Sequence, residues 1–332
     1  MRRSKESGKR RLLDKNYLQQ AIFNRIYPMK SIYLANSVAG FIMFGRLSTL
    51  FSSGLFAPLA AVVIAMVSIS IGASIAKTLF STIGPAGTTL LRLSIAAVIL
   101  SLAFRIWRMR IDRHFLAVMT PYGLALGVMN LTFYMAIERI PLGVALAIEF
   151  TGPLGLSILF SRRPVDLLWI ALAVAGLAVL LPLQGTHEAL DPVGIAFAFT
   201  AGLCWAAYIL TGKRAGGMLG AGAPAIGMII GTVIALPFGI AEGGAALLDH
   251  RVLMVALCVA LLSSAIPYSL EMVALRRLPA KTFSILTCGE PVVGAVMGML
   301  ILGESLPLIK WLGIALILAA SVGVTRSART GR

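Results

Sequence analysis

From residue 57 onward, runs of about 20 apolar residues alternate with short polar joints. A helix of about 20 apolar residues crosses the hydrocarbon core of a bilayer, because each residue advances the helix by about 1.5 Å. The joints leave no room for a domain outside the membrane. The pattern predicts an all-α polytopic membrane protein with ten transmembrane helices, at 57–78, 86–104, 115–137, 141–160, 166–183, 192–211, 222–241, 252–275, 280–302 and 307–325.

Composition supports a membrane protein and changes the interpretation of the charge. Of the 332 residues, 58% are hydrophobic and 13% are charged, whereas soluble domains carry about 25% charged residues. The formal net charge of +16 would indicate nucleic-acid binding in a soluble protein. In a membrane protein this excess usually lies in cytoplasmic loops. We therefore expect membrane lipids, and no nucleic acid, as partners.

Lys and Arg residues lie almost entirely in alternate joints. Twenty-four of the 29 fall on the side that holds the N-terminus. The opposite side has Arg139, Arg251 and Lys310, and the remaining two, Lys77 and Arg92, fall inside spans. An error of one helix would have mixed the two groups. Because cytoplasmic loops are enriched in Lys and Arg, the N-terminus and the C-terminus are both predicted to be cytoplasmic.

Basic extensions occupy both ends of the chain. Residues 1–56 contain a basic segment followed by an apolar stretch, 31–44, that is too short to span a bilayer. This extension is interpreted either as a cytoplasmic tail that orients the first helix or as the product of an upstream start that the native protein does not use. A signalling role would make its deletion inactivating, whereas we expect deletion to be tolerated. Residues 326–332 form a second basic cytoplasmic tail.

The two halves of the membrane part repeat each other. At an offset of 138 residues Pro141 aligns with Pro279, and a second pair of prolines aligns at the same offset. The repeats are predicted at 57–183 and 192–325, with five helices each. Because five is odd, the second repeat is inverted relative to the first. Inverted repeats are typical of secondary transporters, whose substrate site lies near the midplane between the repeats.

Two carboxylates lie deep within predicted spans. Glu149 lies about 12 Å into the fourth span, and Glu290 lies at a similar depth in the ninth. Each is followed by a proline, Pro153 or Pro291, which frees a carbonyl one turn earlier and can open the helix. Such a carboxylate can bind a proton or an ammonium group. The alternative is a neutral glutamate that forms a hydrogen bond with a neighbouring helix.

Two further charged residues within spans are candidates. Arg92 can bind the carboxylate of a substrate with two hydrogen bonds, or it can pair permanently with Glu149 or Glu290. Glu271 lies near the cytoplasmic end of the eighth span. It lines a cavity, or it extends to the membrane interface, or it pairs with Arg276.

Five amphipathic or polar residues complete the candidate set: Asn130, Tyr134, Trp205, Tyr208 and Tyr268. Each can line a cavity, although an aromatic side chain in a transmembrane helix more often serves packing or the interface belt.

Several chemistries find no support in the sequence. Cys204, Cys258 and Cys288 all lie in apolar runs, and the three histidines lie in joints. Nothing resembles a metal site or a nucleophile held by a histidine. The segment before Lys213 lacks the upstream glycine of a P-loop. We therefore expect no cofactor, no metal and no enzymatic activity.

Five segments resemble one family. The bacterial inner-membrane threonine and homoserine exporters are ten-helix members of the drug/metabolite transporter superfamily with two EamA-type repeats. The resemblance covers residues 60–325 and is carried by Gly72–Lys77, Ala147–Pro153, Ser161–Asp166, Cys204–Leu210 and Pro267–Met272. It implies efflux of small neutral amino acids across the inner membrane, driven by the proton gradient.

The residues leave alternatives open. An exporter of the same fold for another amino acid, a purine or a toxic analogue would show the same scaffold motifs. A membrane enzyme or a channel would need catalytic groups or a polar pore ring, and neither is visible in the sequence.

Overall fold

The computed structural model describes residues 56–140, 142–161, 164–180, 191–293, 296 and 307–330. Regular secondary structure in these ranges is entirely helical. All of them belong to one compact unit, Ser53–Arg332. The predicted extension at 1–56 lies outside the described residues, apart from Phe56. The two predicted repeats lie within this unit, and their division into repeats stays a prediction.

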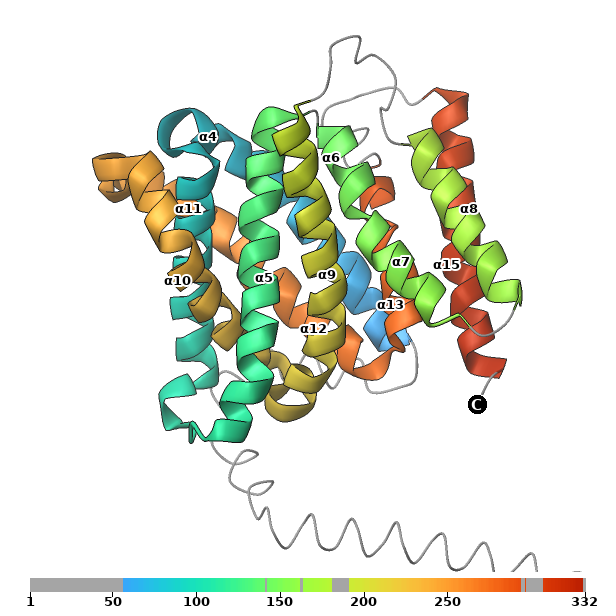
Figure 1. The fold of residues 1–332 in the computed structure, drawn as a ribbon, viewed down its shortest axis with the longest axis horizontal. Coiled ribbons are helices and arrows are strands. Elements are labelled where there is room, and N and C mark those ends of the chain that lie inside the picture. The colour runs from blue at the N-terminus through green and yellow to red at the C-terminus, as the bar shows by residue number, and fades with distance from the viewer. Residues whose placement is uncertain are drawn as a thin grey trace, which may run out of the picture. The chain divides into compact units, whose positions relative to one another are not determined.

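The first two predicted spans form α4 (Phe56–Phe104), which consists of two helical segments that meet at a kink with non-helical backbone. The bend is at Gly84, whose φ of 66° is a conformation that glycine adopts readily. The N–H groups of Ala86 and Gly87 donate to the carboxylate of Glu242, at 2.6 and 3.3 Å. This carboxylate satisfies donors that the bend leaves without helical partners. Figure 1 shows the bend at the top of the view.

The next segments follow the prediction with one interruption. The short helix η1 (Ile106–Arg108) leads to α5 (Arg113–Arg139), which begins where Phe115 N–H donates to Asp112 at 2.7 Å. The predicted span 141–160 is interrupted at Phe150. Its two parts and the following helix are α6 (Leu142–Glu149), α7 (Thr151–Leu159) and α8 (Pro164–Leu180).

Helix α9 (Pro192–Leu219) is two turns longer than its predicted range of 192–211. It continues until Gly220, whose φ of 62° ends the helix. The short helix η2 (Gly220–Gly222), then α10 (Ala223–Gly243) and η3 (Gly244–Leu248), complete this part of the chain.

The last helices include two local irregularities. Helices α11 (His250–Ala260) and α12 (Ile266–Arg277) are joined by a π-helical turn, η4 (Leu261–Ala265). Helix α13 (Ala280–Thr287) ends in a turn, and helical structure resumes at Glu290. The final helix, α15 (Leu308–Thr330), continues beyond residue 325 into the predicted tail.

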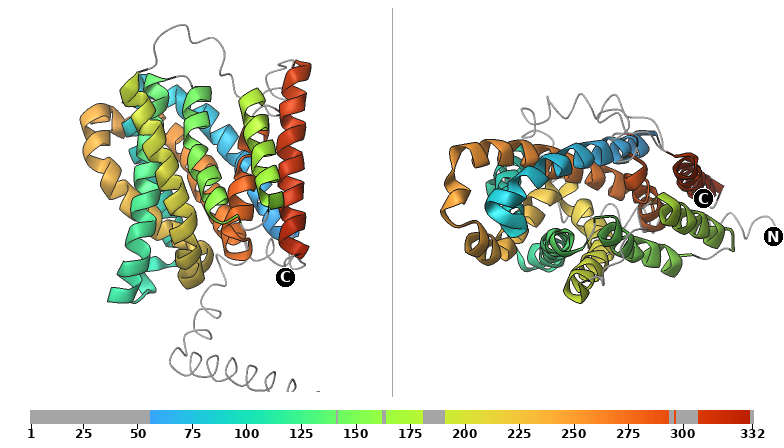
Figure 2. Two further views of the ribbon diagram at one scale, coloured as in Figure 1. Left: turned by 45° about the vertical axis from the view of Figure 1, so that its right-hand side comes forward. Right: turned by 90° about the horizontal axis from the view of Figure 1, so that it is seen from above.

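Close helix contacts occur where glycines face each other. A Cβ atom added to Gly127 of α5 would lie 2.5 Å from the Cα atom of Gly231 in α10. Only small residues allow backbones to approach this closely in a membrane. Helix α9 packs along α5, and α15 packs along α8 (Figures 1 and 2). These contacts build an interior in which Leu93, Tyr122 and Met272 are buried.

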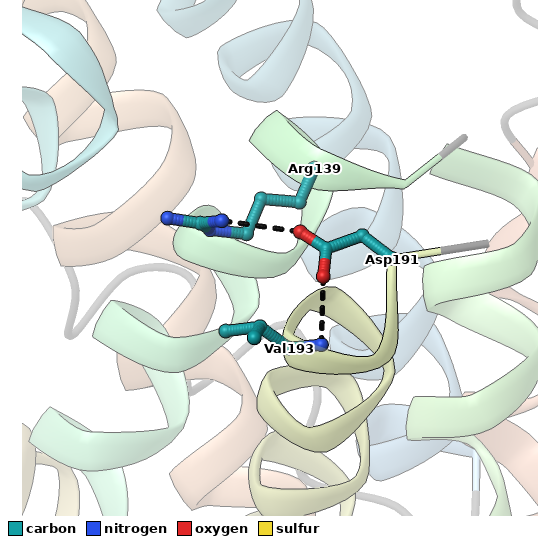
Figure 3. Close-up of polar contacts among 3 residues, drawn as sticks. All are labelled: Arg139, Asp191 and Val193. Carbon is teal, nitrogen blue, oxygen red and sulfur yellow. Dashed lines mark hydrogen bonds and ion pairs between the residues drawn. The ribbon is translucent and has the colours of Figure 1, made fainter.

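Two ion pairs join helix ends of the predicted repeats. Arg139 at the end of α5 pairs with Asp191 at the start of α9, at 3.1 Å (Figure 3). Asp191 also accepts a hydrogen bond from Val193 N–H at 2.8 Å. Lys281 of α13 pairs with Asp166 of α8 at 2.8 Å, and the Asp166 side chain is only 2% exposed.

The helices are suited to a membrane. Four helical segments are long and apolar enough to cross one: Ala57–Phe104, Arg113–Arg139, Pro192–Leu248 and His250–Arg277. The first of these contains the bend at Gly84, and the third contains the turn at Gly220. Shorter apolar helices cover Val144–Leu159, Pro164–Val179 and Leu308–Val324. The all-helical membrane fold is thus observed, while the number of crossings and their direction stay predictions.

Candidate substrate and proton site

Arg92 lies in the second half of α4 among neutral groups and is 5% exposed. Its Nη2 atom donates to Asn130 Oδ1 of α5. Its Nη1 atom has long contacts with the carbonyl and hydroxyl oxygens of Ser263, at 3.4 and 3.5 Å. The ring of Tyr134 lies 4.7 Å from Arg92 Cζ, which adds a cation–π contact. Among the described residues, no glutamate forms the permanent ion pair considered for Arg92.

Asn130 is the centre of this group of contacts. Its Oδ1 atom accepts from Arg92 and, at 3.0 Å, from the hydroxyl of Tyr268 on α12. Its Nδ2 atom donates to the carbonyl of Leu126, one turn earlier in α5, at 2.8 Å. All three contacts agree on one orientation of the amide, so the oxygen faces Arg92.

The π-helical turn η4 presents two free carbonyl oxygens to α4. A residue at position 267 would normally donate its N–H to the carbonyl of Ser263 in an α-helix or of Leu262 in a π-helix, but Pro267 has no N–H. Each of these carbonyls has a partner on α4: Arg92 approaches the first, and Ser68 donates to the second at 2.5 Å. A Cβ atom on Gly72 would lie 2.7 Å from Ser263, so α4 crosses the turn very closely.

A second polar group lies beside Tyr268. The hydroxyl of Tyr208 on α9 donates to Glu271 Oε2 at 3.1 Å. The Tyr208 ring packs edge-to-face against Tyr268 and is stacked on Tyr122, with centroids 5.8 and 5.5 Å apart. The expected alternative, in which Glu271 pairs with Arg276, is not formed among the described residues.

Glu149 lies at the interruption between α6 and α7 and is 7% exposed. The interruption is one turn before Pro153, where the missing N–H leaves the Glu149 carbonyl without its helical donor. Helix α9 crosses at this point, because a Cβ atom on Gly202 would lie 2.6 Å from that carbonyl. Trp205, one turn further along α9, packs against Phe150 with ring centroids 5.1 Å apart.

Glu290 follows the corresponding break in the second predicted repeat, whereas Glu149 precedes the break in the first. At the offset of 138 residues, α6 (Leu142–Glu149) coincides with α13 (Ala280–Thr287). The turn after α13 is again one turn before a proline, Pro291. The two predicted repeats therefore have matching breaks next to their carboxylates.

The structure brings most of the predicted residues into one cluster. Glu290 lies within electrostatic range of both Glu149 and Glu271. Tyr268 lies within the same range of Arg92 and Glu149. With Asn130 bonded to Arg92 and Tyr268, hydrogen bonds and electrostatic interactions link six of the predicted residues, which we call the cluster: Arg92, Asn130, Glu149, Tyr268, Glu271 and Glu290. Trp205 contacts Phe150, the residue after Glu149. The members of the cluster come from both predicted repeats.

Sequence reasoning missed two residues next to the cluster, Ser263 and Tyr122. Ser263 could have been found, because it precedes Pro267 by four residues and its carbonyl is the one that a proline frees in an α-helix. Tyr122 carries no comparable signal. Its ring is stacked on that of Tyr208, which only the packing of α5 against α9 brings about.

Other potential sites lie elsewhere or are not found. A cavity of about 560 Å³ is lined by Thr82, Asp249 and Arg251 near the bend of α4, and no residue of the cluster lines it. Within the described part of the chain, no group of three or more His, Cys, Asp or Glu residues is placed to hold a metal ion.

Apolar helices of membrane length with charged residues buried among them define a multi-pass membrane protein with a polar interior site. Residues 192–326 match the model of the EamA-like transporter family, a range that spans the second predicted repeat. The chain belongs to this family. Because the family consists of transporters, membership is consistent with the prediction that the chain is not an enzyme.

Relatives extend the match over most of the chain. The threonine/homoserine exporters RhtA of Salmonella typhimurium LT2 and Escherichia coli K12 are each 47% identical over 272 residues, covering 82% of this chain and 92% of theirs. The uncharacterized inner membrane transporter YicL of Salmonella typhimurium is 28% identical over 213 residues, covering 60% and 69%. One crystal structure of another protein superposes with a TM-score of 0.68 at 15% identity, covering 82% of this chain and 98% of that chain, and indicates the fold alone.

Proposed function

We propose that the protein exports small neutral amino acids, threonine and homoserine above all, across the bacterial inner membrane in exchange for protons. Identity of 47% to exporters named for these two substrates supports the substrate class. The cluster, which links three carboxyl groups to Arg92 through Asn130 and the tyrosines, is the structural observation that supports this function most directly.

The proposed architecture has ten transmembrane helices in two inverted repeats, with both ends of the chain in the cytoplasm. The two ion pairs agree with this topology, because each pair joins helix ends that the topology assigns to the same side of the membrane. Arg139 pairs with Asp191 on the outer side, and Lys281 pairs with Asp166 on the inner side. The matching breaks at Phe150 and after α13 support the repeats.

The cluster has the groups that a zwitterion requires. A carboxylate can bind the ammonium group of the substrate, and a guanidinium can bind its carboxylate. In the proposed cycle, Glu149 or Glu290 binds a proton when the site faces outward. Loss of that proton toward the cytoplasm then lets the same carboxylate bind the substrate ammonium. Competition between the proton and the substrate for one carboxylate couples their movements in opposite directions.

Counterflow in proteoliposomes tests this function. Purified protein is reconstituted, and uptake of labelled threonine and homoserine is measured against an internal pool of unlabelled amino acid, with and without an imposed pH gradient. We expect exchange of both amino acids and accumulation that follows the gradient. Folded protein that exchanges neither would contradict the substrate assignment and would favour another metabolite, such as a purine. Accumulation that ignores the gradient would contradict proton coupling.

A further inference from the structure

In the part of the chain that the structure describes, no acidic side chain forms an ion pair with the buried Arg92. Placing a charged side chain in the hydrocarbon of a membrane is costly even on the mildest scale. A buried charge normally pairs with an opposite one, yet the acceptors around Arg92 are an amide oxygen, a carbonyl and a hydroxyl. Its Nε atom has no hydrogen-bond partner among the described residues. The surroundings hold the guanidinium in place and leave its charge uncompensated.

Three elements hold this position together. Asn130 of α5 is bonded to Arg92 and is itself oriented by Tyr268 of α12 and by its own helix. The π-helical turn before Pro267 brings Ser263 to the other side of the guanidinium. Each group is neutral, so each fixes geometry and none cancels the charge. A rigidly placed guanidinium is what bidentate recognition of a carboxylate requires.

We propose that Asn130, Tyr268 and Ser263 are positioning residues that hold Arg92, with its charge uncompensated, for the carboxylate of the transported amino acid. This inference rests on the proposed function and makes it more specific. Substrates must then carry a free carboxylate. The neutrality of Asn130 is the decisive property, because a carboxylate at that position would occupy Arg92 permanently.

The test is Asn130→Asp, which keeps the shape of the side chain and supplies a partner for Arg92. Binding of labelled threonine to purified protein is measured in competition with threonine and with threonine amide, which lacks the carboxylate. A charge-assisted hydrogen bond contributes about 1.5–3 kcal/mol, which is about a 10- to 100-fold difference in affinity. The wild-type protein should prefer threonine by about that factor, and Asn130→Asp should abolish the preference by weakening threonine alone.

Tyr268→Phe provides a milder second variant. It removes one hydrogen bond to Asn130 Oδ1 and keeps the ring, so threonine affinity should fall about 2- to 10-fold while amide affinity stays unchanged. Thr132→Val is the matched control on α5, because the Thr132 hydroxyl bonds only within its own helix. This control should bind like the wild type.

The outcomes separate the inference from the proposed function. A wild-type protein that binds neither threonine nor homoserine would contradict the function and the inference together. A wild-type protein that binds threonine and its amide equally would contradict carboxylate recognition. Retention of the full preference in folded Asn130→Asp would overturn the positioning role while leaving amino-acid export intact.

Discussion

At the scale of single residues, the membrane interior makes every buried charge informative. Glu149 and Glu290 lie on opposite sides of matching helix breaks: Glu149 is the last residue before one break, and Glu290 is the first helical residue after the other. To couple proton entry to substrate export, a carboxyl group must be open to only one side of the membrane at a time. We propose that the two glutamates serve this coupling rather than packing.

Glu149→Gln or Glu290→Gln should abolish accumulation that is driven by a pH gradient, and the variant that does so identifies the coupling carboxylate, because an amide has the shape of a protonated carboxyl group but cannot titrate. The measurement is uptake of labelled threonine in proteoliposomes with an imposed gradient. Glu138→Gln, at an exposed position near the end of α5, serves as the control and should accumulate like the wild type. Full accumulation by both interior variants would disprove the scheme.

The candidate residues could be predicted because polar groups stand out in apolar spans, but their partners could not. Periodicity places Arg92, Asn130 and Tyr268 within three spans, yet it does not show that these spans meet. The hydrogen bond from Tyr208 to Glu271 joins residues 63 positions apart. It depends on how α9 and α12 pack, which no local pattern specifies.

At the scale of helices, small residues set the crossing points. Gly152 of α7 faces Gly202 of α9, where a Cβ atom on Gly152 would lie 1.8 Å from the Gly202 carbonyl oxygen. This contact holds the interruption next to Glu149 against α9. The sequence predicted a break here from Pro153. The sequence predicts a joint between the first two spans, and the kink at Gly84 lies there. It does not predict that the backbone N–H of Ala86 donates to the carboxylate of Glu242, 156 residues away.

Gly152→Ala should destabilise the protein, because the added methyl group meets backbone that cannot move aside without shifting α9. Overpacking of this kind costs about 1–3 kcal/mol. The thermal midpoint of the purified protein in detergent is the measurement, together with threonine exchange. Gly155→Ala, one turn further along α7, is a matched control because nothing lies within 4 Å of an added Cβ atom there. Equal midpoints for the two variants would contradict the proposed crossing.

At the scale of the whole molecule, the two ion pairs differ in what they contribute. The pair of Lys281 and Asp166 is largely shielded, with side chains 18% and 2% exposed, whereas those of Arg139 and Asp191 are 45% and 32% exposed. Asp166→Asn leaves a shielded lysine without its partner and should cost about 3–5 kcal/mol. Asp191→Asn should have a much smaller effect, because exposed pairs are weak. Thermal midpoints at neutral pH test this comparison, and Asp166→Asn should have the lower midpoint. A lower midpoint for Asp191→Asn would contradict the larger contribution of the shielded pair.

The pH dependence of the exposed pair has a defined direction. Hydrogen bonds from Val193 N–H and from Arg139 lower the pKa of Asp191 below its ordinary value. A lowered pKa in the folded state stabilises the fold above the unfolded pKa, and the gain is lost as the pH falls through the folded pKa. The difference in thermal midpoint between the wild type and Asp191→Asn should therefore shrink on acidification. A difference that grows would indicate that the carboxylate is not the stabilising form.

The predicted orientation of the molecule rests on the distribution of its Lys and Arg residues and can be measured directly. If loops rich in Lys and Arg are cytoplasmic, then the exposed Arg214 near the end of α9 lies inside the cell and the exposed Arg251 at the start of α11 lies outside. After the native cysteines Cys204, Cys258 and Cys288 are replaced and exchange activity is verified, Arg251→Cys should react with a membrane-impermeant maleimide in intact cells. Arg214→Cys should react only after the membrane is opened. Arg214 and Arg251 lie on either side of α10 in the chain. Labelling of both from outside would therefore mean that the predicted number of crossings between them is wrong. Labelling of Arg214→Cys alone from outside would mean that the whole protein is inserted in the opposite direction.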